Sequence, residues 1–149
     1  MTRWPLAVTA CMFLALAGEA AAQTSATPKP RSTRTGVYSR EQADRGSDVY
    51  IGMCKSCHTL DSHTAATFTA KWNAKPLSVL YEYIRDQMPK NEPGSLTEQE
   101  YADVLAYVLK LNRMPAGPDD LPTDVAVMKT IRIETTTPTT TKTPARKSP

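Results

Sequence analysis

The feature that most constrains this chain is the run Cys-Lys-Ser-Cys-His at positions 54–58. Two thiols at this spacing can add to the two vinyl groups of a haem, while the imidazole that follows ligates the iron from one face. The motif therefore predicts covalent haem attachment through Cys54 and Cys57, with His58 as the first iron ligand. A buried haem would then form a large part of the core.

Three other uses of these residues compete with haem attachment. Together with His63, the motif makes a Cys2His2 set, but zinc fingers hold their ligand pairs on separate elements, whereas these residues share one short loop. A redox dithiol would need a strand before the motif, and none is visible. A structural disulfide would leave His58 without a use. Haem attachment accounts for both thiols and for the imidazole.

Residues 1–22 have the pattern of a secretory signal. One arginine precedes an apolar stretch that is short for a bilayer span, and Glu19 and a small-residue cleavage site ending at Ala22 follow it. Removing the signal also removes Cys11, which leaves the two motif cysteines as the only ones. We therefore expect an exported, periplasmic protein without a stable membrane segment.

The rest of the chain is predicted to be one small domain between two polar segments. Residues 23–36 and 134–149 are rich in Thr, Ser, Pro and basic residues, which cannot bury enough apolar area to become ordered. We expect a flexible linker and a disordered tail there, and a compact domain over residues 37–133. Because a core of this size is marginal, we expect the chain without haem to be poorly folded.

Three helices are predicted from apolar spacing and capping residues. The first begins after Ser39 and ends near Met53, the second covers residues 77–87 between two prolines, and the third begins after Thr97 and ends near residue 111. Ser39 and Thr97 are each followed three residues later by Gln or Glu, which predicts capping boxes. The helices should bury Ala43, Gly46, Tyr50, Leu77, Leu80, Tyr81, Ile84, Tyr101, Val104, Leu105 and Val108.

No alternating strand pattern of useful length appears, so the predicted fold class is all-α. Residues 120–133 are expected to add one short helix, before the chain packs against the domain. The inward side chains of this segment should be Leu121, Val125, Met128, Ile131 and Ile133.

The order of these features resembles a class I monohaem cytochrome c over roughly residues 38–112. A helix with Gly46 precedes the Cys-x-x-Cys-His loop, a middle helix ends in Met88-Pro89, and a last helix contains Tyr107. The resemblance implies that the first and last helices cross at Gly46, and that haem attachment takes place outside the cytoplasm. Segments 94–97 and 112–117 further resemble small periplasmic cytochromes found beside quinoprotein dehydrogenases.

A second iron ligand has to reach the opposite face of the haem. His63 follows His58 too closely to do so, whereas Met88 lies far along the chain and its thioether suits haem iron. Met114 is the main rival, but the family brings its methionine in before the last helix. Met53 adjoins the attachment site, and every Met can also be core filler. We predict Met88 as the distal ligand.

Two side chains outside the motif are expected to contact the haem. By analogy with the family, Trp72 packs beside it, and its indole could reach a propionate or a backbone carbonyl. Lys75 is a candidate partner for a propionate. Lys55, Lys71 and Lys90 fall, with Lys75, in loops expected to flank the haem, where they are either solvated or able to steer an acidic partner.

Ligands on both faces favour electron transfer, because iron can then change oxidation state with little rearrangement. The sequence predicts a soluble, monomeric periplasmic electron carrier that binds one haem c and no nucleic acid. The resemblance implies redox partner proteins, with a quinoprotein dehydrogenase as candidate donor and an oxidase as candidate acceptor. The alternative is a haem enzyme or gas sensor of peroxidase-like chemistry, which requires a labile Met88.

Overall fold

The computed structural model describes residues 31–135. The predicted signal, and most of the predicted linker and tail, lie outside the described residues. The described part is mostly helical, with two strands of two residues each, which confirms the all-α class. Its long helices are α1 (Arg40–Met53), α3 (Leu77–Gln87) and α4 (Glu98–Leu111), and these match the three predicted helices.

Helix α1 begins where the sequence predicted, but only half of its capping box forms. The Ser39 side chain accepts a hydrogen bond from the Gln42 amide. The side-chain amide of Gln42 is turned into the core instead, where it donates to the Leu121 carbonyl at 3.0 Å and accepts from the Leu121 amide at 2.6 Å. A buried pair of bonds to the C-terminal segment therefore replaces the predicted bond back to Ser39. At α4 the complete capping box of Thr97 and Glu100 is present.

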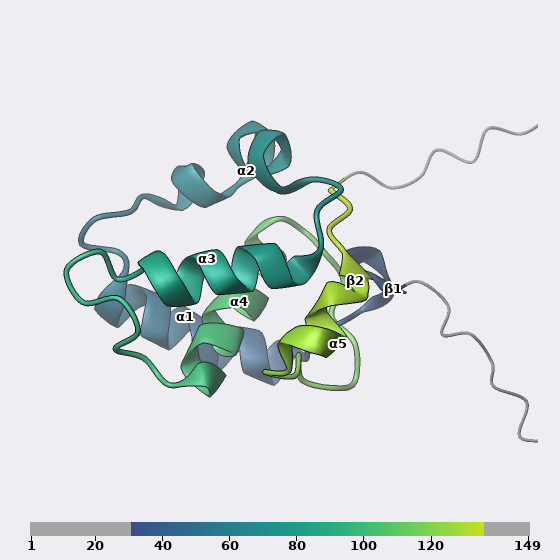
Figure 1. Cartoon of the computed structure of the whole chain (residues 1–149). Coiled ribbons are helices and arrows are strands. Elements are labelled where there is room, and N and C mark those ends of the chain that lie inside the picture. Colours follow the sequence, from purple (N-terminus) through teal and green to yellow (C-terminus); the bar gives the residue numbers. More distant parts are fainter. Residues whose placement is uncertain (1–30, 136–149) are drawn as a thin grey trace, which may run out of the picture.

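Helices α1 and α4 cross with their backbones in contact. A Cβ atom placed on Gly46 would lie 1.8 Å from the carbonyl oxygen of Asp103, so only glycine permits this approach. One turn further along α1, the ring of Tyr50 lies 5.4 Å from that of Tyr107. The predicted crossing point is confirmed, and Figure 1 shows α1 and α4 on one side of α3.

A polar network reinforces this crossing at the surface. Arg45 makes two hydrogen bonds, of 3.0 and 3.2 Å, to the carboxylate of Asp103, which is only 4 % exposed. The same guanidinium reaches Asp120 at 2.7 Å, and Asp120 also accepts a hydrogen bond from the Ser39 hydroxyl. The network therefore fastens α1 both to α4 and to the segment that follows α4.

On the other side of α3 lie two short helices that are not among the three predicted from the sequence. They are η2 (Leu60–His63) and α2 (Ala65–Trp72), and α2 is set apart from the three long helices in Figure 1. Neither has a side-chain cap at its first turn, and α2 has only eight residues. Its two buried residues, Phe68 and Trp72, are four positions apart and so share one face.

The C-terminal segment packs against the end of the domain away from the Met88–Leu96 loop. Helix α5 (Val125–Lys129) leads into strand β2 (Ile131–Arg132), which pairs in parallel with β1 (Arg31–Ser32). Four of the five predicted inward side chains are buried, and Val125 is partly buried. Ile133 also exchanges backbone hydrogen bonds with Ala74 and Lys75, at 2.8 and 2.9 Å. The segment thus holds the junction between α2 and α3.

The structure corrects the edges of both predicted flexible segments. Residues 31–36, which were assigned to the linker, form β1 and the short helix η1 (Thr33–Thr35), and Thr33 is fully buried. Glu134 donates its amide to the Thr33 hydroxyl at 3.0 Å, and Thr135 donates to Asn73 at 3.1 Å. Polar composition predicted disorder here, but hydrogen bonds between the two segments order them.

Among residues 31–135, no helix has the length and apolar character needed to cross a bilayer.

Candidate haem site

The motif cysteines lie on a tight turn that continues α1. The amides of Cys57 and His58 both donate to the Cys54 carbonyl, at 3.1 and 2.9 Å. Residues three and four positions apart lie on one side of such a turn, so the two thiols and the imidazole share that side. Tyr50, in the last turn of α1, anchors this turn, because its carbonyl accepts a hydrogen bond from the Cys54 amide at 2.9 Å.

The motif opens onto a cavity of about 730 Å³ between α3 and the η2–α2 segment. Its wall is mostly apolar, and the side chains that matter most here are those of Cys54, Cys57, His58, Trp72 and Met88. All five of these were singled out from the sequence. They come from three separate segments of the chain, and the fold brings them to one cavity.

Cys54 and Cys57 are both free thiols in the structure. Burial raises the pKa of the Cys54 thiol, whereas Cys57 is exposed. The structure therefore does not contain the disulfide that was one alternative. Within residues 31–135, no group of three or more His, Cys, Asp or Glu side chains is placed to hold a metal ion by itself.

The candidate methionines fall into two groups, those that line the cavity and those that are buried in the core. Met88 lines the cavity from the end of α3, and Met53 lines it from the motif side. Met114, the main rival in the sequence, is 3 % exposed in the core, where its carbonyl accepts from the Tyr38 hydroxyl at 2.6 Å. Met128 is fully buried in the core. Of the candidates, only Met88 enters the cavity from a segment remote from the motif.

His63 lies inside the site but next to His58. Their ring centroids are 4.7 Å apart, and the Tyr50 ring meets His63 edge-on at 5.8 Å. Burial, followed by the nearby His58 and Lys71 charges, lowers the pKa of His63. Its carbonyl accepts from the Asn112 side chain at 2.8 Å, which ties η2 to the end of α4. His63 therefore shares the motif side of the cavity, in agreement with its exclusion as a distal ligand.

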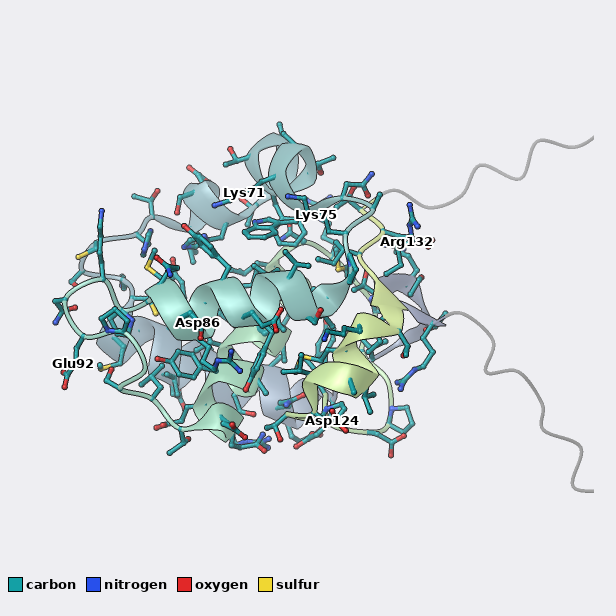
Figure 2. All side chains as sticks on the ribbon, in the orientation of Figure 1. Lys71, Lys75, Asp86, Glu92, Asp124 and Arg132 are labelled. Carbon is teal, nitrogen blue, oxygen red and sulfur yellow. The ribbon has the colours of Figure 1, made fainter. Side chains whose placement is uncertain are left out.

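Of the four lysines expected in loops that flank the haem, two line the cavity, and one of these two lies in a helix. Lys71, on α2, lines the cavity, and its ammonium lies 4.0 Å from the Tyr83 ring centroid and 4.8 Å from that of Trp72. Lys75, labelled with Lys71 in Figure 2, lies 5.3 Å from the same Trp72 ring centroid. It is not among the wall residues. Because Lys75 follows the end of α2, it sits beyond Trp72, and its contact with a haem propionate stays a prediction. Lys90 also lines the cavity, and Lys55 does not.

Several wall residues carried little signal in the sequence. Phe68 and Tyr83 line the cavity beside Trp72. Phe68 lies four residues before Trp72, and Tyr83 lies four residues after Val79, so these spacings could have suggested a helix face in each segment. Tyr101 was predicted as a buried helix residue only. Its hydroxyl in fact donates to the Met88 carbonyl at 2.9 Å.

Two free thiols, an imidazole and a thioether on one mostly apolar cavity are the donor set of a covalently attached haem. The residues present therefore fit that group. Cys54 and Cys57 would hold it, while His58 and Met88 face the same cavity as candidate iron ligands.

Comparison with known proteins agrees with this site. Residues 41–108 match the family model described as "Cytochrome C oxidase, cbb3-type, subunit III". No curated protein and no solved structure matches the chain. The matched region begins in α1 and ends in α4, so it contains the motif, the cavity and Met88.

The fold and the site define a c-type cytochrome domain. The chain carries, in particular, a class I monohaem cytochrome c with covalently bound haem c, and such domains transfer electrons to and from redox partners.

Proposed function

We propose that this protein is a soluble periplasmic electron carrier whose haem iron is ligated by His58 and Met88. The observation that carries the proposal is that these two residues line the same cavity from different segments of the chain. His58 lies on the attachment turn, and Met88 lies at the end of α3. When bound, the haem supplies reversible one-electron chemistry between Fe(III) and Fe(II). Cys54 and Cys57 would attach the haem, the cavity would enclose it, and His58 and Met88 would hold its iron.

The cavity wall suits that contribution. Phe68, Leu80 and Val104 are nearly fully buried along it, and such apolar side chains limit the access of water. If His58 and Met88 both hold the iron, this pair of ligands would raise the reduction potential and favour electron transfer over binding of a substrate at the iron. Electron transfer then needs only contact between partners near the cavity mouth. The alternative, a haem enzyme or gas sensor, would require Met88 to leave its place.

The rim of the cavity supports a protein partner with an acidic surface. Lys71 and Lys90 are exposed and line the opening, and the whole chain has a formal net charge of +3. Cations placed around a docking site accelerate encounter with an acidic partner in a salt-dependent way. We propose a dehydrogenase donor, of the quinoprotein class, and an oxidase as acceptor. The predicted signal at residues 1–22 supports export to the periplasm.

The ligand assignment is tested by the near-infrared and visible spectrum of the ferric holoprotein. We expect a sulfur-to-iron charge-transfer band in the wild type, loss of that band in Met88→Ala, and its retention in Met53→Leu, which alters the other methionine on the wall. A wild type without the band would favour the enzyme or sensor alternative. A band that survives Met88→Ala would show that another sulfur is the ligand.

Attachment, partner and location need separate measurements. Haem should remain with the protein in acid acetone, and it should be extracted from the Cys54→Ala, Cys57→Ala double variant.

A reduced quinoprotein dehydrogenase should reduce the ferric protein at a rate that falls as salt rises, and a rate independent of salt would contradict the role of the lysines. Fractionation of cells that express the full chain should place the haem protein in the periplasm.

A further inference from the structure

Met88 is held by both of its main-chain polar groups. Its amide donates to the Ile84 carbonyl at 3.0 Å, which completes the last turn of α3. Its carbonyl accepts from the Tyr101 hydroxyl at 2.9 Å. Because Tyr101 belongs to α4 and is 1 % exposed, this second bond connects the candidate ligand to the buried core of the domain.

The same hydroxyl closes the loop that follows Met88. The Leu96 amide donates to it at 3.4 Å, so one side chain contacts both ends of the segment 88–96. Between those ends, residues 90–95 are exposed, as Glu92 at the tip of the loop shows in Figure 2. Within the described part of the chain, the hydrogen bonds of residues 89–95 are local, from Glu92 to Pro89 and from Ser95 to Glu92.

We propose that Tyr101 is a positioning residue for Met88, and that its hydroxyl sets how readily another ligand displaces the thioether from the haem iron. The inference rests on the proposed function, since it requires Met88 to be the distal ligand. Without the hydroxyl, the Met88 carbonyl loses its donor and the ends of the loop lose their common contact. The loop would then open more often, and the thioether would leave the cavity wall with it.

The experiment is a titration of the ferric holoprotein with imidazole, followed by loss of the sulfur-to-iron charge-transfer band. In Tyr101→Phe the band should still be present, because the ring keeps its packing, but imidazole should bind about tenfold more tightly. Tyr81→Phe is the matched control. Tyr81 is also 1 % exposed, and its hydroxyl donates to the Glu98 carbonyl at 3.3 Å, away from Met88. It should change the imidazole affinity less than twofold.

A double-mutant cycle separates positioning from a general loosening of the cavity. In a Met88→Ala background no thioether competes, so Tyr101→Phe should no longer alter the imidazole affinity. If it tightens binding there as well, the effect comes from access to the cavity and the proposal is overturned. Equal effects of Tyr101→Phe and Tyr81→Phe would overturn it too.

Failure of this inference and failure of the ligand assignment give different results. A charge-transfer band that is absent from the wild type, or kept in Met88→Ala, removes Met88 as the ligand and with it the role of Tyr101. A band that depends on Met88, together with an imidazole affinity that Tyr101→Phe leaves unchanged, overturns only the positioning role. Urea unfolding of the holoproteins should show that the two Tyr→Phe variants lose comparable stability.

Discussion

The two sides of α3 are built on different principles. On one side, α1 and α4 meet with backbone against backbone at Gly46, and the Arg45–Asp103 pair fastens them at the surface. On the other side, η2 and α2 pack mainly against each other and face the cavity. The first side is held together by direct contacts between its two helices, and only part of it, including Tyr50, Val104 and Val108, lines the cavity. The second side, η2 and α2, faces the cavity that the haem would fill. We therefore expect the stability of this side to depend on the cofactor.

Loss of the haem should have the largest effect and should fall unequally on these two sides. In the Cys54→Ala, Cys57→Ala variant we expect most of the roughly 5–15 kcal/mol that is typical of a domain to be lost. Amide exchange should accelerate most over residues 60–72 and least at the α1–α4 crossing. Ser56→Ala, which keeps both thiols, is the control. Equal acceleration of amide exchange on both sides would show that the two sides depend equally on the haem.

A methyl group at the crossing should damage the first side directly. In Gly46→Ala the new Cβ would lie 1.8 Å from the Asp103 carbonyl oxygen, so the helices must separate. We expect a loss of about 3 kcal/mol or more in the free energy of unfolding of the holoprotein, measured in urea. Gly52→Ala, on the same helix with open space around it, should be neutral or stabilise by up to about 1 kcal/mol. Similar losses in both variants would contradict the close approach.

The bond that ties the second side to α4 should have a smaller and local effect. Asn112 donates to the His63 carbonyl at 2.8 Å, and Asn112→Ala removes that donor. We expect amide exchange over residues 60–72 to rise about fivefold, which corresponds to about 1 kcal/mol, while the crossing is unchanged. Asn73→Ala alters the other end of α2, where the side chain bonds Thr135, and serves as control. An effect that spreads into α1 would show that the two sides are coupled more strongly.

The smallest expected effect is a pH dependence of the first side. Hydrogen bonds from Ser39 and then Arg45 hold the pKa of Asp120 below its usual value of 3.8. A carboxylate with a lowered pKa stabilises the fold above the unfolded-state pKa, and that contribution disappears as the pH falls through the folded-state pKa. Because the Asp120 side chain is 46 % exposed, solvent screening keeps the contribution below about 1 kcal/mol.

The Asp120→Asn variant checks this sign. Its deficit in unfolding free energy relative to wild type should be present from pH 7 to pH 5 and should shrink below about pH 4. Asp119→Asn, at the exposed neighbouring position, should show no such trend. A deficit that grows on acidification would mean that the carboxylate does not stabilise the fold.

The sequence was most informative where one residue type satisfies one strict requirement. The Gly46 crossing, the Thr97 capping box and the limits of α3 each follow from such a requirement, and the structure agrees with them. The roles of Cys54, Cys57, His58 and Met88 toward the haem stay predictions, although all four face one cavity.

The parts that could not be predicted depend on contacts between distant segments. Gln42 turned away from its capping box because the Leu121 main chain, 79 residues further along, offers two buried hydrogen bonds. Helix α2 is short and uncapped, and it forms as part of the cavity wall. That Lys71 and not Lys75 lines the cavity depends on where α2 ends, and the contact of Tyr101 with Met88 depends on how α4 passes behind the loop.

The parallel pairing of β1 with β2 has a practical consequence for electrochemistry. It brings Arg31 and Arg132 to the same end of the domain, while the loop that carries Glu92 lies at the other end (Figures 1 and 2). A linker to an electrode surface, or a fused redox enzyme, can therefore be joined beside either strand without covering the Met88 loop. Immobilised in that way, the protein would present the same face outward in every molecule, and current could be compared directly between variants of that loop.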